Sequence, residues 1–187
     1  MSALLIVLLV LVVVVMGGVG IYNALVGLRN RAAGAWADIA VQLKRRHDLV
    51  GNLVETVKGY ATHERQTLEQ VIDARNRAAG TTGSGGPREA GPAENALSTT
   101  LRSLFALAEA YPDLKANQNF QDLQRALESL ETDIQNARRY YNAVVRDYNT
   151  KIQSVPSVFI ARPFGFAERD FFELTDPAEA QVPQVRF

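Results

Sequence analysis

The two histidines are the side chains best suited to bind a metal ion or transfer a proton. His47 and His63 are widely separated, so each would need partners of its own. A zinc-protease helix carries a second histidine four residues after the first, but that position after His63 is Thr67. Di-iron bundles carry a glutamate three residues before each histidine, and those positions are Lys44 and Tyr60. The histidines therefore predict positions on a helix surface or interface, and no metal site.

Other reactive groups give no stronger signal. None of the serines lies in a Gly-x-Ser-x-Gly motif. The stretch Gly83-Ser84-Gly85-Gly86 lacks the lysine of a phosphate-binding loop. There is no cysteine, which excludes disulfides and a thiolate nucleophile. The sequence therefore predicts a protein that is not an enzyme, with no catalytic residue and no cofactor.

The N-terminal residues are suited to a lipid environment. Residues 3–21 are apolar throughout, and the first charged side chain is Arg29. As a helix rising about 1.5 Å per residue, this run is close to the ~30 Å hydrocarbon thickness of a bilayer. We therefore predict a transmembrane helix over residues 1–22. The alternative is a cleaved signal peptide, which would have a basic start, a shorter apolar run and a small-residue cleavage site.

Charge suggests an orientation and disfavours one class of partner. Arg29, Arg31 and the cluster Lys44-Arg45-Arg46 all follow the predicted span. The positive-inside rule then places the N-terminus outside and the remainder in the cytoplasm. The whole chain has 20 basic and 20 acidic residues and no net charge, so nucleic acid is not an expected partner.

Apolar residues at helical spacing predict an all-α fold. One stripe steps by three or four residues from the span onward: Ile21, Leu25, Leu28, Ala32, Ala35, Ile39 and Leu43. Another runs from Phe120 to Tyr148 as a heptad seam typical of a coiled coil, before Pro156. We expect a helix break or kink near Gly51 and a flexible loop over residues 80–92. We therefore expect residues 23–155 to form an antiparallel four-helix bundle of long helices that is continuous with the transmembrane helix. Residues 156–187 form a Phe- and Pro-rich C-terminal segment.

Two groups of residues suggest contacts with other molecules. Small residues at spacings of three, four and seven form what we call the small-residue seam: Gly17, Gly20, Ala24, Gly27 and Gly34. Such seams let helices approach closely in lipid, which favours self-association; a lipid-facing seam or docking to a different membrane protein is the alternative. Aromatic side chains of the C-terminal segment either cover the bundle itself or contact a partner or the bilayer surface: Phe164, Phe166, Phe171 and Phe172.

Charged and polar residues of the predicted bundle have a structural interpretation. The basic cluster that ends in His47 is expected on a solvated face, or in salt bridges to Asp38, Glu55 or a neighbouring helix. Contact with anionic lipid headgroups is the alternative. A buried network that fixes helix register, or alternatively a ligand or partner site, is expected from six residues on or near the apolar stripes: Asn23, Arg29, Asp38, Asn52, Glu55 and Arg75.

Long stretches of the sequence resemble a known family. They include YNALVGLRN, AWADIAVQLKRRHDL and NLVETVKGYATHE between Tyr22 and Arg75, then LKANQNFQDLQRALESLETDIQNARRYYNAVVRDYNT and the closing VPQVRF. Over essentially its whole length the chain resembles the LemA family of bacterial proteins. The resemblance implies a single-pass protein of the bacterial cell (inner) membrane with a short exterior N-terminus and a helical-bundle domain. The molecular function of that family is not established, so the resemblance implies no catalytic residues. Relatives often have proline before NLV, where this chain has Gly51.

Two functions follow as hypotheses. The first is a non-enzymatic, membrane-anchored scaffold of the LemA type that forms a homo-oligomer in the lipid bilayer. The second is an adaptor or receptor that binds another membrane or envelope-stress protein through the bundle or the C-terminal segment.

Overall fold

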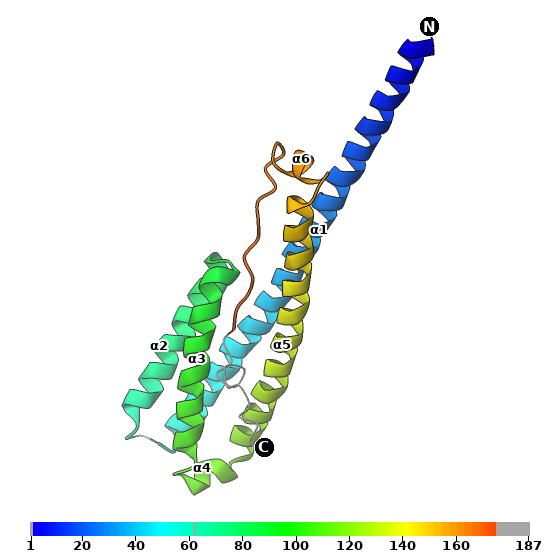
Figure 1. Ribbon diagram of the computed structural model, residues 1–187. Coiled ribbons are helices and arrows are strands. Elements are labelled where there is room, and N and C mark those ends of the chain that lie inside the picture. The colour runs from blue at the N-terminus through cyan, green and yellow to red at the C-terminus, as the bar shows by residue number, and fades with distance from the viewer. Residues whose placement is uncertain (1, 62, 175–187) are drawn as a thin grey trace, which may run out of the picture. The chain divides into compact units, whose positions relative to one another are not determined.

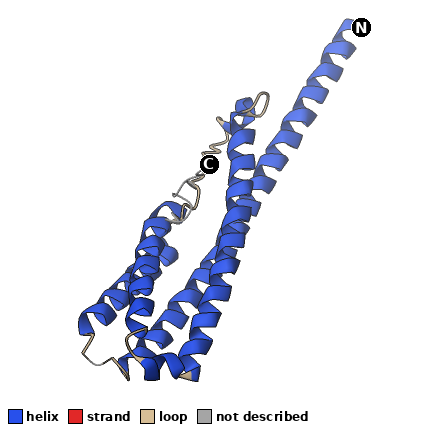
Figure 2. Cartoon of the chain, turned by 60° about the horizontal axis from the view of Figure 1, so that its bottom comes forward, coloured by secondary structure: helices blue, strands red, loops and turns tan. Residues whose placement is uncertain are grey.

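The chain folds into helices joined by short connections. The computed structural model describes residues 2–61 and 63–174. Its helices are α1 (Ser2–Lys58), α2 (Arg65–Ser84), α3 (Pro87–Ala108), α4 (Pro112–Ala116), α5 (Gln118–Gln153) and α6 (Val158–Ala161) (Figure 1). Figure 2 shows the same helices by secondary structure, and no strand occurs in the described residues. The predicted all-α class is confirmed.

The described residues divide into two compact units. Residues 2–36 and 140–170 form the first unit, and residues 37–139 without 62, together with residues 171–174, form the second. Helices α1 and α5 each contribute residues to both units. The last part of the predicted C-terminal segment, residues 175–187, lies outside the described residues.

The second unit is built around one apolar core. Four helical segments surround it, from α1, α2, α3 and α5, and α4 adds Leu114. Its fully buried side chains include Val50, Leu53, Val57, Val71, Leu97 and Leu104. Burial of each such aliphatic side chain contributes about 1.5–3 kcal/mol, so tertiary packing outweighs local helix propensity here.

The predicted helix break near Gly51 is wrong, because α1 continues to Lys58. A glycine in a helix interior costs about 1 kcal/mol relative to alanine. The buried side chains that follow Gly51 repay that cost several times over, since Leu53 and Val57 are completely buried. Arg75 of α2 reaches the same turn and donates from Nε to the His47 carbonyl oxygen at 3.1 Å.

The predicted loop over residues 80–92 is also wrong, since most of it is helical. α2 continues to Ser84 and α3 begins at Pro87, which leaves a two-residue connection. The hydroxyls of Thr81 and Thr82 both donate to the Ala78 carbonyl oxygen at 2.9 Å, within the last turns of α2. Pro87 stands at the start of α3, where its fixed φ suits the helix and its missing N–H is not needed.

The first unit packs α1 against the end of α5 and against α6. Its core comprises Leu25, Tyr148, Ile152, Ala161 and Phe166, all buried. After α6 the chain turns at Gly165, whose φ of +69° is a conformation that other residues rarely adopt. The turn places the Phe166 N–H 3.0 Å from the Ala161 carbonyl oxygen and directs the Phe166 ring into the core.

Beyond the turn, an extended segment follows α5, and we call residues 166–174 the strap. In the first unit Asn149 makes two hydrogen bonds with the Arg169 backbone, each 2.9 Å long. The Tyr141 hydroxyl donates to the Asp170 carbonyl oxygen at 2.9 Å. Burial raises the pKa of Tyr141, so this phenol stays a neutral donor well into the alkaline range.

In the second unit the strap is held by α5 and α3. Arg138 Nη1 donates to the Leu174 carbonyl oxygen at 2.5 Å. On α3, a methyl group at Gly91 would lie 2.5 Å from the Glu173 carbonyl oxygen. Only a glycine permits the backbones to approach this closely, which explains why the residue type is tolerated inside α3.

Candidate functional site

The most unusual feature of the second unit is a buried cluster of charged side chains. Arg46 and His47 on α1 meet Glu94 on α3. Arg46 Nη1 donates to Glu94 Oε2 at 3.0 Å, and His47 Nε2 lies 2.7 Å from Glu94 Oε1. Their side chains are 5%, 4% and 0% exposed, so the carboxylate is fully enclosed by its partners. We call these three residues the buried ionic cluster.

The cluster extends toward a third helix and toward solvent. Arg46 Nη2 donates to Ser98 Oγ at 2.7 Å, and Ser98 in turn donates to the Glu94 carbonyl oxygen. The same Nη2 lies 3.2 Å from Oε2 of Glu131 on α5, whose side chain is 40% exposed. Arg46 therefore connects α1, α3 and α5, with one strongly buried acidic partner and one that remains partly hydrated.

The geometry of the cluster favours a structural role over chemistry. Both oxygens of Glu94 already have partners, and the side chain has no exposed surface for a substrate to contact. Within residues 2–61 and 63–174 no three His, Cys, Asp or Glu side chains come together as a metal site. A charge pair of this kind fixes which residues of α1 face α3, because any sliding of the helices would leave buried charges unpaired.

Several predicted positions differ from those observed. The solvated face predicted for Arg46 and His47 is wrong, as is their pairing with Asp38 or Glu55, because both are buried. The predicted alternative, salt bridges to a neighbouring helix, is confirmed, since both side chains contact Glu94 on α3. The expected buried network is not formed by the predicted six residues: Arg75 is half-buried, and the other five are exposed, namely Asn23, Arg29, Asp38, Asn52 and Glu55. The two histidines lie as predicted in that His47 is at a helix interface and His63 is exposed, the latter in the connection between α1 and α2.

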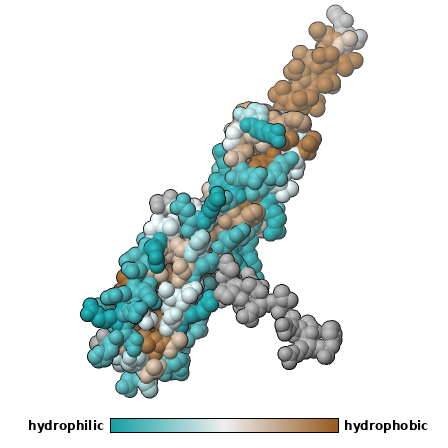
Figure 3. Space-filling model, turned by 60° about the vertical axis from the view of Figure 1, so that its left-hand side comes forward, coloured by the Kyte–Doolittle hydropathy of each residue, from teal (hydrophilic) through white to brown (hydrophobic). Residues whose placement is uncertain are grey.

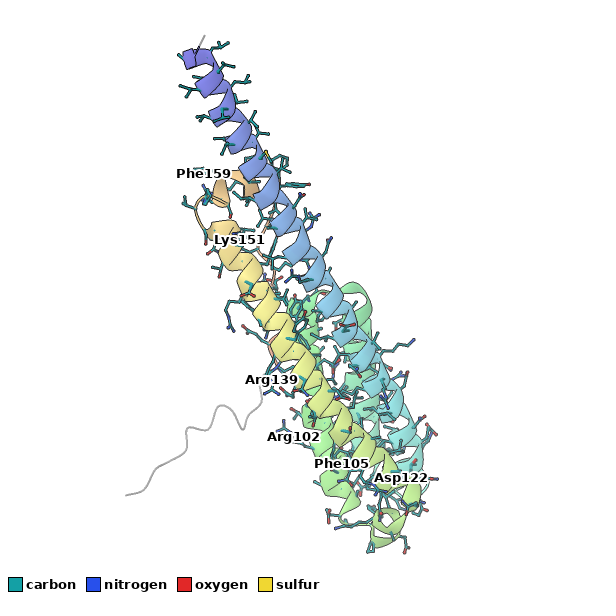
Figure 4. All side chains as sticks on the ribbon, turned by 90° about the vertical axis from the view of Figure 1, so that its right-hand side faces the viewer. Arg102, Phe105, Asp122, Arg139, Lys151 and Phe159 are labelled. Atoms are coloured by element: carbon teal, nitrogen blue, oxygen red, sulfur yellow. The ribbon has the colours of Figure 1, made fainter. Side chains whose placement is uncertain are left out.

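A groove lies beside the cluster on the surface of the second unit. It has a volume of about 310 Å³ and combines charged, amide and apolar side chains, among them Arg46, Arg102, Phe105, Gln124, Glu131 and Leu174. Figure 4 labels Arg102 and Phe105 on α3. The groove offers an arginine and carboxylates beside a mostly apolar lining, which suits a peptide segment with both apolar and charged side chains.

The small-residue seam lies on an open face of α1. Gly17, Gly20, Ala24 and Gly34 are exposed, and Gly27 is half-buried. A methyl group added at any of the four glycines would meet no atom within 4 Å. Space is therefore available along the seam for the backbone of another helix.

The four phenylalanines of the C-terminal segment fall into two classes. Phe166 and Phe172 are buried in the chain's own units, at 8% and 0% exposure. Phe164 and Phe171 remain 62% and 38% exposed. Any contact with a partner or a bilayer would therefore involve Phe164 and Phe171, while the other two stabilise the fold.

Comparison with known proteins identifies relatives. A model of the LemA family matches residues 35–187. Magnetosome protein MamQ of Magnetospirillum gryphiswaldense is 25% identical over an alignment that covers 88% of this chain and 70% of that protein. Magnetosome protein MamQ 2 of Paramagnetospirillum magneticum is 24% identical, with coverage of 81% and 64%. Protein LemA of Metamycoplasma hominis is 25% identical, with coverage of 88% and 74%. The chain thus spans roughly two thirds of the length of the two magnetosome proteins.

Proposed function

The chain belongs to the LemA family, and from that premise we propose that it is a non-enzymatic, membrane-anchored scaffold that associates with copies of itself. The observation that carries the proposal is the surface of α1. Its side chains from residue 3 to residue 16 are apolar and exposed, and the same helix continues into both packed units. Figure 3 shows this apolar surface at the N-terminal end of the helix.

The exposed apolar side chains of residues 3–16 require an apolar environment around α1. Fourteen consecutive apolar side chains without a packing partner would be insoluble in water, whereas a bilayer covers them on all sides. α1 is long and apolar enough to cross a membrane. A bacterial cell membrane with the N-terminus outside and both units in the cytoplasm agrees with the arginines that follow the apolar run, Arg29 and Arg31.

Self-association is supported by the small-residue seam. In lipid, helices associate through close packing and not through hydrophobic burial, so glycine and alanine on one face allow the closest contact. The seam is open along its length and runs from the apolar part of α1 to Gly34, past the first charged side chain. A second copy placed along it would contact the chain both inside the membrane and beside the first unit.

Gly20→Ile is expected to weaken this association. The side chain would project into space that is open in one chain but filled in the assembly, so it would leave the single chain intact and separate the helices. We expect a loss of about tenfold in the association constant, or about 1.4 kcal/mol. Single-molecule mass measurement of the full chain in lipid nanodiscs would report the monomer and oligomer populations.

Leu11→Ile provides the matched control for this substitution. Leu11 lies nine residues from Gly20 on the opposite side of α1 and is 59% exposed. Its substitution should leave the oligomer population unchanged. A monomeric wild-type chain, or equal effects of both substitutions, would contradict self-association through the seam.

A second function has one observation in its favour. The groove between Arg102 and Glu131 is open, lies next to the strap and combines charged groups with a mostly apolar lining, which suits an adaptor or receptor that binds a segment of another membrane or envelope-stress protein. Loss of a co-purifying protein on Arg102→Glu, with the oligomer intact, would favour this function.

A further inference from the structure

The connection between α5 and the strap forms an apolar surface beside the proposed anchor. We call residues 155–165 the apolar tip; it contains α6 and the turn at Gly165. Its large side chains are strongly exposed: Val155 at 75%, Phe159 at 68% and Phe164 at 62%. Figure 4 labels Phe159 on this connection, beyond Lys151 of α5. Aromatic rings at this level of exposure lack a cover within the described chain.

The tip contacts a defined level of α1. A methyl group at Gly18 would lie 3.6 Å from Ile160 Cδ1. The rings of Tyr22 and Phe164 meet edge to face with their centroids 5.0 Å apart. An apolar groove of about 320 Å³ lies between the two segments and is lined by Val15, Gly18, Val19, Tyr22, Ile160 and Phe164.

That level falls inside the apolar run of α1. Gly18 is three residues before Ile21, the last residue of the run, and Val15 is six residues before it. At 1.5 Å per residue, the contacts extend about 5–9 Å from the end of the run toward its centre. If residues 3–21 occupy the hydrocarbon layer, the tip side chains reach the part of that layer next to the headgroups.

The charges around the tip agree with such a position. Arg162 is the only ionisable residue between positions 154 and 167, and it is exposed. Arg29 lies over the Phe166 ring, 5.3 Å from its centroid, eight residues beyond the apolar run. Long basic side chains at the edge of an apolar surface can reach lipid phosphates while their stems stay in the apolar region.

We propose that the apolar tip inserts into the headgroup and outer acyl region of the same bilayer leaflet through which α1 leaves the membrane, as a second membrane contact. The inference rests on the proposed transmembrane role of α1. Lipid is the partner that covers the tip, because the exposed rings of the tip continue the apolar surface of α1 at the level of residues 15–22. The tip thereby fixes the tilt and rotation of α1, which orients the small-residue seam in the plane of the membrane.

Three single-cysteine variants test the insertion, in a chain that has no cysteine of its own. Phe159→Cys reports on the tip, Leu11→Cys on the anchor, and Ala143→Cys on an exposed position of α5. Each full-length protein carries an environment-sensitive fluorophore and is reconstituted into phosphatidylcholine–phosphatidylglycerol vesicles. Nitroxide groups on the lipid acyl chains act as quenchers, close to the headgroup for positions 159 and 143 and near the end of the acyl chain for position 11, which lies about 15 Å along α1 from Ile21.

We expect the label at position 159 to be blue-shifted and quenched several-fold more strongly than the label at position 143. Quenching at position 11 but not at 159 would overturn the insertion and leave the anchor intact. A blue-shifted label at 159 that lipid nitroxides do not quench would also overturn it, because another protein would then cover the tip. Absence of quenching at position 11 would overturn the proposed anchor and the insertion together.

Discussion

Glu94→Leu is expected to lower the free energy of unfolding by about 3–5 kcal/mol, because it leaves Arg46 and His47 buried without their carboxylate. Leucine has a similar volume, so the loss would report the missing charge and not a cavity. Guanidinium unfolding of the detergent-solubilised chain, followed by helical circular dichroism, measures the difference.

Glu131→Leu is the matched control for this substitution. It removes the other acidic partner of Arg46, but that side chain is 40% exposed, so the expected loss is at most about 1 kcal/mol. The triple variant Arg46→Met, His47→Leu, Glu94→Leu should recover most of the stability, since no buried charge remains. Equal losses for Glu94→Leu and Glu131→Leu would show that the ionic cluster does not determine the stability of the second unit.

Tyr141→Ala is expected to destabilise the first unit by about 3–5 kcal/mol, through loss of a buried ring and the cavity left behind. The ring is 1% exposed and lies 5.7 Å, between centroids, from the ring of Trp36. Trp36 is the single tryptophan of the chain, so its fluorescence follows the unfolding of this unit directly.

The neighbouring residue supplies a control in the same helix. Tyr140 is 57% exposed, so Tyr140→Ala should change the unfolding free energy by less than about 0.5 kcal/mol. Tyr141→Phe keeps the ring and removes only the hydrogen bond to the Asp170 carbonyl, for an expected loss of about 1 kcal/mol. Similar losses for the two alanine variants would mean that the ring does not connect α1, α5 and the strap as described.

The helices and their core faces could be predicted from periodicity. The stripe from Leu25 to Leu43 predicts the buried face of α1, and Leu25, Ile39 and Leu43 are indeed fully buried. The heptad seam up to Tyr148 likewise predicts the buried side of α5. Such regular spacing is informative because the helix repeat alone determines which residues share a face.

The errors arose where tertiary contacts outweigh local preference. Gly51 and the segment around Gly85 read as breaks, because glycine is locally unfavourable in helices. At Gly51 the helix continues because the residues that follow it are buried in the core. Around Gly85 the break is confined to two residues, because Pro87 starts the next helix. The first outcome cannot be read from a short window, since the contacts that stabilise the residues after Gly51 come from other helices. For the second, Pro87 was a local signal of a helix start that the glycine-rich composition obscured.

The residues of the buried ionic cluster occupy core positions of the helical repeat, which a pattern of apolar residues alone does not reveal. Continuing the α1 stripe beyond Leu43 by three residues reaches Arg46, and a further four reaches the buried Val50. On α3, Glu94 stands three residues before the buried Leu97 in the same register. Opposite charges at core positions of two helices predict a buried pair, although the sequence could not show that those two helices meet.

The most direct test of the central claim is disulfide formation by Ala24→Cys in native membranes, compared with Ala33→Cys. Both alanines are exposed on α1, and nine residues place them half a turn apart around the helix, with only Ala24 on the small-residue seam. Mild oxidation should convert the Ala24→Cys chain to a covalent dimer and leave the Ala33→Cys chain monomeric. Two monomeric variants, or equal dimer yields from both positions, would contradict a scaffold that assembles through this face of α1.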